Sequence, residues 1–591
     1  MNPADASDRE RLSAALNHCY EELAPFRRTR RELIEEYAGS RYGQSILGPE
    51  KPTTFVNLIQ DLVKAQKTAL AYNDPRFLVT AKRGEQESFG ARFQTALNTY
   101  VKKIHFGDTL RDIIGDAIFQ VGIGKVYLAD SPEVYHENDI WMDPGMPYLG
   151  RVSLDDFCYD VSKDDLRKCQ FIANRYTMDY ETALACPYFD AEVRKDLEPS
   201  KWDQREGRWE RASSIASNGD HTDAEIEDVV DLIDVYLPKE RLVCTWPVYG
   251  KFEIMSTRPL AVLPWDGPET GPYRFLSLID VPDNIMPTSP AQSLYALFYL
   301  YNFLMRRIAD RAMRAKTVIS YEAGAGEDVA RLKDARDMEL VKVNRTKAME
   351  VQQFPGPDQG LVNFALGIHE LFNRAGGNLE SMLGTGPSAA TVGQEEMIDQ
   401  RVGAQLAESR KKVNRFVSEC GQDIGWLLFD DPMQVIPGER QIPGTDYTVN
   451  ADWAPPDILP RHGTFADYGI EVEPYSMEYK SPQQRLGQAF SIMGQLAPLM
   501  PMAQQQGLEF QFDAFLKDVA ELAGEPRLTQ WFRSAPPPPM TEPGQMPGVR
   551  PPGTGQYTRT NISQGPTSAG RLTMLTQQQP QQPIMSGGAM Q

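Results

Sequence analysis

Helical periodicity dominates the first 120 residues. Apolar residues recur every three or four positions within four stretches, 8–37, 54–72, 90–104 and 109–119. The stretch FLVTAK at 77–82 alternates between apolar and polar residues instead, which is typical of a strand. We therefore expect several helices and one short strand in this part of the chain.

The hydrophobic period changes at Val121. Between 121 and 285, apolar and polar residues alternate in GIGKVYLAD, RVSLDDFCYD, KCQFIANRY, EDVVDLIDVYL and RLVCTW, and turn-rich spacers separate these segments. The pattern predicts an antiparallel α+β region, and the polar stretch 202–223 inside it an exposed loop. The fold class is mixed α+β, mainly helical.

A long helix is expected to begin at Ser289. Ser289 is the predicted N-cap, Pro290 the first helical residue, and Gln292 would complete a capping box. An apolar stripe follows at Leu294, Leu297, Phe298, Tyr301, Leu304, Met305 and Ile308, and basic residues follow it at Arg306, Arg307, Arg311, Arg314 and Lys316. Three of these, Arg307, Arg311 and Arg314, share a helix face. They are either a solvated face paired with carboxylates of a neighbouring helix or subunit, or positive charge facing a polyanion in a channel.

A small β module and a second helix come next. TVISY, RDMELVKVN and AMEVQQF have strand patterns, with GAGED and a short helical turn between them. A helix is then expected to start at Asp358 and to continue to Leu383. Two helices flanking a β module predict a helical hairpin with a β cap at its far end.

A loop of small residues precedes an unusually long helix. The loop contains Gly384, Thr385, Gly386, Ser388, Ala389, Ala390, Thr391 and Gly393. Thr391 and Gln394 form a T-x-x-Q capping box, and apolar residues at helical spacing continue to Asp431 and Pro432. The helix should be about 55 Å long at 1.5 Å per residue, which is longer than a globular core needs.

The last part of the chain contains a predicted hairpin, a predicted helical bundle and a tail of biased composition. VIPGER and TDYTVNADW predict a hairpin with its turn at Pro437 and Gly438, and residues 475–533 predict a helical bundle. Beyond Ala535 the composition is rich in Pro, Gln and Gly, with few charges or large apolar groups. Such a tail cannot bury enough surface to offset its ordering entropy, so we expect 534–591 to be disordered or to become ordered on a partner.

Charge and cysteine usage narrow the possible functions. The 61 basic and 81 acidic residues give a net charge of -20, which argues against a surface that grips nucleic-acid phosphates. The six cysteines have no paired spacing, so we expect neither a zinc site nor a disulfide framework, and a reducing compartment fits best. We also expect no export signal and no membrane span.

The sequence contains no recognisable catalytic motif. GIGK at 122–125 lacks the first glycine and the hydroxyl residue of a phosphate loop, and is better interpreted as a strand whose glycines allow close packing. The histidines form no HExxH, and there is no G-x-S-x-G. Paired carboxylates such as Asp155 and Asp156 are interpreted as solvated turns. We therefore expect a protein that is not an enzyme, with no catalytic, cofactor-binding or metal-binding residues and no cofactor.

The order of these elements resembles the portal proteins of tailed double-stranded DNA bacteriophages, particularly the large portals of short-tailed phages. The stretch FQVGIGKVYLAD followed by RVSLDDFCYD and KCQFIANRYTMDY is similar to the family's wing region. The resemblance covers about residues 10–530 and depends on the order of elements more than on any short motif.

The resemblance implies a division of the chain into named parts. These are a wing at 1–285, a stem helix at 286–316, a clip at 317–354, a second stem helix at 355–383, a tunnel loop at 384–393, a long wing helix and hairpin at 394–453, and a helical crown at 454–533. Family portals often extend the crown into a long helical barrel. Here Pro536–Pro539 would stop such a helix, so we expect no barrel.

The resemblance also implies a function and partners. A ring of probably twelve copies would form a channel at one capsid vertex, through which double-stranded DNA is packaged and ejected without sequence specificity. Terminase, tail or head-completion adaptors, and capsid and scaffolding proteins would be the partners, in a virion assembled in the host cytoplasm. Two alternatives stay open: a DNA-processing enzyme, such as a metal-dependent nuclease or packaging subunit, and a helical cytoplasmic scaffold or adaptor.

Overall fold

The computed structural model divides the chain into two units, residues 1–511 and 512–591, and every residue described below lies in the first. The structure describes residues 6–39, 55–129, 135–137, 140–199, 229–249, 252–254, 258–265, 267, 271–321, 326–334, 342, 349–354, 356–383, 392–441, 448–473, 476–477 and 494. Within these ranges the fold is a mixture of helices and strands, as the sequence predicts.

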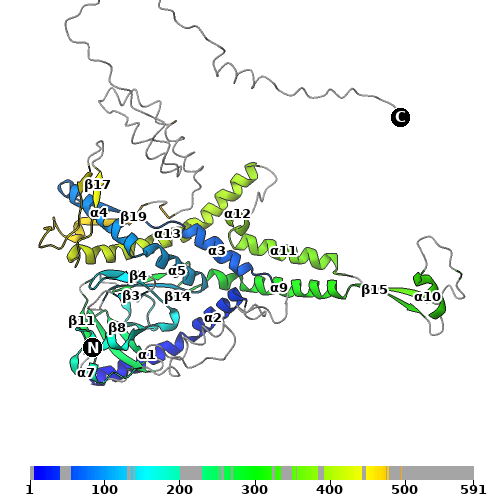
Figure 1. Cartoon of the computed structure of the whole chain (residues 1–591), viewed down its shortest axis with the longest axis horizontal. Coiled ribbons are helices and arrows are strands. Elements are labelled where there is room, and N and C mark those ends of the chain that lie inside the picture. Colours follow the sequence, from blue (N-terminus) through cyan, green and yellow to red (C-terminus); the bar gives the residue numbers. More distant parts are fainter. Residues whose placement is uncertain are drawn as a thin grey trace, which may run out of the picture. The chain divides into compact units, whose positions relative to one another are not determined.

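Five helices form the first part of the chain (Figure 1). They are α1 (Ala6–Glu22), α2 (Ala24–Ala38), α3 (Leu58–Leu70), α4 (Glu87–Lys103) and α5 (Phe106–Phe119). The strand predicted at 77–82 is β1 (Phe77–Ala81). Asn57 caps α3, because its side chain accepts a hydrogen bond from the backbone N–H of Gln60 at 3.0 Å. The predicted helices and strand of this region are confirmed, except that the stretch predicted at 8–37 forms two helices, separated at Leu23.

Antiparallel sheets form the middle of the chain, as the alternating pattern predicts. One sheet has the order β12-β2-β5, with β2 (Gly122–Leu128) between β5 (Pro147–Val152) and β12 (Tyr273–Leu276). A larger sheet runs β10-β9-β8-β7-β6, with β11 also paired to β9. Its strands are β6 (Phe157–Tyr159), β7 (Ile172–Asp179), β8 (Val229–Leu237), β9 (Leu242–Tyr249), β10 (Glu253–Ile254) and β11 (Ala261–Pro264).

Smaller elements complete this region. They are the hairpins β3 (Tyr135–Glu137) with β4 (Ile140–Met142) and β13 (Ile279–Val281) with β14 (Asn284–Thr288), and the short helices α6 (Tyr180–Ala185) and α7 (Ala191–Lys195). The loop predicted at 202–223 lies outside the described residues.

The predicted helical hairpin is present, with one difference. It consists of α9 (Pro290–Arg314), β15 (Lys316–Tyr321), α10 (Gly326–Asp334), β16 (Met349–Phe354), α11 (Gln359–Ala375) and α12 (Leu379–Leu383). Strands β15 and β16 are antiparallel, and α9 packs along α11 (Figure 1). The single helix predicted to reach Leu383 is wrong: Gly377 and Asn378 adopt positive φ and separate α11 from α12. The strand predicted at RDMELVKVN lies outside the described residues except for Lys342.

The long helix is confirmed as α13 (Val392–Asp430), which has 39 residues. Its predicted N-cap, Thr391, lies outside the described residues. Two of its glycines allow close packing, since a Cβ on Gly421 would lie 2.1 Å from Phe77 and a Cβ on Gly425 would lie 2.5 Å from Ile470. The strands that carry those side chains, β1 and β19 (Tyr468–Val472), form an antiparallel pair across this helix.

Two predictions about the segment after α13 are wrong. The hairpin β17 (Glu439–Gln441) with β18 (Thr448–Asn450) does not turn at Pro437 and Gly438, because Gly438 lies in the paired arm and its carbonyl accepts from the N–H of Ala451. The helical crown was expected to begin at 454, but 454–473 contains no α-helix and ends in β19, which pairs with β1. The rest of the predicted crown and the tail lie outside the described residues, apart from 476–477 and 494.

Candidate functional site

The inner half of α9 is fixed firmly in the main core. Ser289 accepts a hydrogen bond from the N–H of Gln292 at 2.9 Å, so the predicted N-cap is confirmed. Asn302 is fully buried: its Oδ1 accepts from the N–H of Val56 at 2.8 Å and its Nδ2 donates to the carbonyl of Val56 at 3.1 Å. Both contacts hold α9 against the segment that leads into α3. The start of the hairpin is therefore part of the folded body.

Helices α9 and α11 pack on each other through a narrow apolar face. Tyr301 of α9 lies beside His369 of α11, with ring centroids 5.5 Å apart. The buried residues of this face are Leu304 on α9 and Ala365, Ile368 and Phe372 on α11. His369 thus lies at the interface between the two helices.

Large apolar side chains remain on the outer faces of both helices. Tyr299 and Phe303 on α9 are 53% and 47% exposed, and Met313 near the end of α9 is 76% exposed. On α11, Phe364 and Leu371 are 53% and 48% exposed, and Leu366 is also exposed. A cluster of half-exposed aromatic and leucine residues on one element indicates a surface for contact with another molecule.

The basic residues at the end of α9 differ in exposure and in their contacts. Arg307, Arg311 and Arg314 are exposed, and within the described part of the chain no carboxylate forms an ion pair with them. Arg306 is half-buried and its Nε donates to the carbonyl of Asn302 at 3.2 Å. Lys316 is the first residue of β15, and its side chain is not described. The face shared by Arg307, Arg311 and Arg314 is thus present as predicted.

The predicted tunnel loop, 384–393, lies outside the described residues apart from its last two positions, which belong to α13. Gly384, Thr385, Gly386, Ser388, Ala389, Ala390 and Thr391 lie outside the described residues, and Gly393 is the second residue of α13. Further along α13, polar contacts attach the helix to the body. The Nε of Arg410 donates to the carbonyl of Ala69 at 3.3 Å. The Nζ of Lys412 donates to the carbonyl of Leu278 at 3.0 Å and lies 2.9 Å from Asp280 of β13. The helix that follows the loop is therefore anchored beyond its first few turns.

A further contact is a buried ion pair between Arg274 of β12 and Asp423 of α13. The Arg274 Nη2 lies 2.7 Å from the Asp423 Oδ1, and both side chains are almost fully buried. The Arg274 Nη1 also donates to the carbonyls of Gly271 and Tyr273. Burial raises the pKa of the Asp423 carboxyl to about 7, although Arg274 acts in the opposite direction. Only one oxygen of the Asp423 carboxylate has a hydrogen-bond partner, because among the described residues no donor reaches its buried Oδ2.

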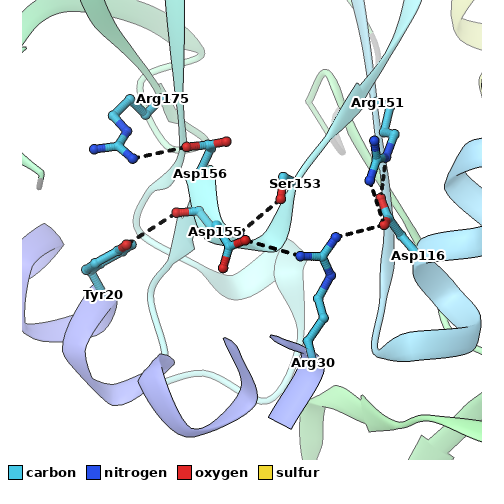
Figure 2. A network of polar contacts seen from close by, with 8 residues as sticks. All are labelled: Tyr20, Arg30, Asp116, Arg151, Ser153, Asp155, Asp156 and Arg175. Atoms are coloured by element: carbon cyan, nitrogen blue, oxygen red, sulfur yellow. Dashed lines mark hydrogen bonds and ion pairs between the residues drawn. The ribbon is translucent and has the colours of Figure 1, made fainter. Parts of the chain in front are cut away.

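A second buried network joins α2 to the sheets (Figure 2). The Arg30 guanidinium donates to Asp116 of α5 at 2.9 Å and to Asp155 at 3.2 Å. Arg151 of β5 forms two hydrogen bonds with Asp116, at 2.5 and 2.8 Å. Burial alone would raise the pKa of Asp116, but Arg151 and Arg30 hold it below its ordinary value.

The acidic pair at 155–156 corrects the sequence interpretation. Asp155 and Asp156 were expected to be solvated, but both are buried, and Asp156 forms an ion pair with Arg175 of β7 at 3.1 Å. They lie in a 3-10 turn between β5 and β6, whose backbone brings them to arginines that are distant in sequence. Spacing along the chain carries no signal for such partners.

The GIGK stretch is a strand, as expected, and its lysine is half-buried rather than available to a phosphate. Lys125 lies 2.6 Å from Asp234 of β8 and its Nζ donates to Asn174 of β7 at 3.1 Å. A Cβ on Gly122 would lie 2.4 Å from the carbonyl of Ile113. The glycine therefore allows α5 to approach β2 closely.

Within the described ranges, no three His, Cys, Asp or Glu side chains are arranged to hold a metal ion. All six cysteines are free and buried. Burial raises the pKa of the Cys244 thiol to about 12. Of the helices described, none combines the length and apolar character needed to cross a membrane.

Comparisons with known proteins add no family to this picture: no protein-family model matches the chain, and no curated protein matches it.

Proposed function

We propose that the chain is a structural protein that assembles into a ring and forms a channel for double-stranded DNA, in the manner of a phage portal protein. The ring would stand at one vertex of a viral capsid, with about twelve copies around its axis. It would act without a cofactor and without catalysing a reaction. The terminase, tail adaptors, and capsid and scaffolding proteins would bind around it in the virion.

One observation carries this proposal: the hairpin packs into the core through one face and leaves large apolar side chains half-exposed on its other faces. Its inner half is held by Asn302 and a buried apolar face, whereas its outer faces carry Tyr299, Phe303, Phe364 and Leu371 half-exposed. Fully covering a large apolar side chain contributes about 1.5–3 kcal/mol, so packing against neighbouring copies would stabilise an assembly. A protein that acts as a single copy gains nothing from this arrangement.

The charge distribution supports a channel through which DNA slides. A net charge of -20 disfavours tight, general binding of phosphates. The exposed Arg307, Arg311 and Arg314 on α9 would supply a few positive positions per copy. Weak and repeated attraction of this kind lets a polyanion move, whereas a strongly basic lumen would hold it.

The long helix supports the same proposal. Its described anchors, among them Arg410 and the Arg274–Asp423 pair, hold α13 against the body, and the small-residue stretch 384–391, which the sequence predicts to be a loop, precedes α13 in the chain. A loop without charge or bulk at the start of an anchored helix suits a position beside moving DNA.

Negative-stain electron microscopy of the purified full chain tests the proposal. We expect rings with a central hole. A uniform population of compact monomers or dimers under all assembly conditions would contradict the proposal. Cleavage of plasmid DNA in the presence of magnesium would instead support the nuclease alternative.

A further inference from the structure

The outer apolar residues of the hairpin form two ridges. On α9, Tyr299 and Phe303 are four residues apart and share a face. On α11, Phe364 and Leu371 are seven residues apart, which also puts them on one face. We call the first pair the α9 ridge and the second pair the α11 ridge.

The two ridges lie at the same level along the hairpin. The helices are antiparallel, because α9 leads into β15, α11 follows β16, and these strands pair with Lys316 opposite Phe354. Tyr301 lies beside His369. Tyr299 precedes Tyr301 by two residues, and Leu371 follows His369 by two. Because the helices are antiparallel, both steps lead away from the β module. At 1.5 Å per residue, Tyr299 and Leu371 each lie about 3 Å from the Tyr301–His369 contact in that direction.

The equal position of the two ridges along the hairpin would allow them to meet in a ring. Copies in a closed ring are related by rotation alone, so each residue keeps its height along the ring axis. If the hairpins run along that axis, a residue on one copy can meet only residues of the same height on the next. Tyr299 and Leu371 satisfy this condition, whereas Met313 lies about 18 Å further toward the β module than Tyr301.

We propose, on the basis of the proposed ring, that the α9 ridge of one copy packs against the α11 ridge of the next copy. The contact is heterologous: two different faces meet, and each copy uses both. The partner of each ridge is therefore a second copy of this chain, and the apolar residues that a single copy leaves exposed are covered in pairs around the ring.

Charges near the hairpin tip fit this pairing. Arg311 follows Tyr301 by ten residues, and Asp358 precedes His369 by eleven, so the two are within one residue of the same level. Both are exposed, and in the described part of the chain neither has an ion-pair partner. Pairing α9 with α9 in the same direction would instead bring Arg307, Arg311 and Arg314 of two copies together.

Cysteine cross-linking of the full chain tests the pairing. The variant Tyr299→Cys/Leu371→Cys, treated with a short bis-maleimide, should give a ladder of covalent multimers on a denaturing gel. Each single variant should give almost none. The native chain is the background control, since its six cysteines are buried. Met313→Cys/Leu371→Cys is the matched control: it carries two exposed thiols at different levels and should give no ladder.

The outcomes separate this inference from the proposed function. Covalent dimers from Tyr299→Cys alone would mean that α9 packs against α9 and would overturn the inference. Rings in the electron microscope without a ladder from the double variant would also overturn it, and would leave the ring proposal intact. Absence of rings in both native and variant protein would contradict the proposed function itself.

Discussion

The hairpin and the body around α13 use the same kinds of residue in opposite ways. In the body, arginines are buried and paired: Arg30 with Asp116 and Asp155, and Arg274 with Asp423. On α9, Arg307, Arg311 and Arg314 are exposed, with no ion pair among the described residues. Aromatic side chains divide in the same manner, since Phe93 is fully buried while Phe303 is half-exposed.

This difference indicates that the body around α13 stabilises the fold of a single chain, whereas the outer faces of the hairpin are available for contacts with another molecule. Breaking a buried ion pair leaves an uncompensated charge, so substitutions in the body should affect the free energy of unfolding. The apolar side chains on the outer faces of the hairpin are about half-exposed, so substitutions there remove less buried surface and should mainly affect assembly. The following changes test this division, beginning with the largest expected effect.

Replacing the shared carboxylate of the network should have the largest effect. We expect Asp116→Ala to lower the free energy of unfolding by about 3–5 kcal/mol, because Arg151 loses its carboxylate partner and Arg30 keeps only Asp155. Chemical denaturation at one fixed protein concentration measures it. The matched control is Glu370→Ala, which removes the exposed pair with Arg374 and should cost less than about 1 kcal/mol. Equal losses for the two variants would contradict the division.

The pH dependence of stability should reveal Asp423. Its folded pKa of about 7 is above the ordinary value of 3.8, so the folded chain binds an extra proton between these values. Stability contributed by this group is therefore present at low pH and falls as the pH rises toward 7. At about 1.4 kcal/mol per pKa unit, the fall approaches ~4 kcal/mol.

The variant Asp423→Asn isolates this contribution. We expect the native chain to lose stability relative to Asp423→Asn as the pH rises from 4 to 7, as measured by urea denaturation at each pH. Some groups contribute to the pH dependence with the opposite sign, such as Asp116, whose lowered pKa costs stability in acid. Their contributions are the same in both proteins, so they cancel when the two free energies of unfolding are subtracted. A difference that does not change with pH would show that Asp423 ionises normally.

Close packing of α13 predicts a smaller loss. In Gly421→Ala the new Cβ would lie 2.1 Å from the buried ring of Phe77, so the helix or β1 must shift, at a cost of about 1–3 kcal/mol. Gly367→Ala on α11 is the control, because no atom lies within 4 Å of its Cβ position. That variant should gain up to about 1 kcal/mol from better helix propensity. Denaturation curves of both proteins, recorded together, should shift in opposite directions.

The periodicity of the sequence predicted much of this fold. The strands of the middle region, the start of α9 at Ser289, and the 39-residue helix follow from hydrophobic period and capping residues, which act locally. The break between α11 and α12 was missed because the apolar spacing continues across Gly376 and Gly377. The pairing of β19 with β1 was missed because nothing local indicates a partner that lies far away in sequence.

In the candidate site, too, the features set by local spacing were predicted, and those set by tertiary structure were not. The shared face of Arg307, Arg311 and Arg314 follows from spacing on a helix. The ridges were not recognised, although LYALFYLYNFLM is apolar on more sides than one helix interface can bury, which is a signal for a second contact surface. The buried partners of Asp155 and Asp156 depend on tertiary structure alone. The tunnel loop stays a prediction.

The most direct test of the central claim is the mass in solution of Tyr299→Glu/Phe303→Glu, compared with the native chain by light scattering and with thermal unfolding recorded alongside. We predict that the native chain has a mass of about twelve copies, and that the variant has the mass of one copy with a nearly unchanged unfolding transition. A variant that keeps the native mass, or that loses its fold together with its assembly, would contradict the division between a body that folds and a hairpin that assembles.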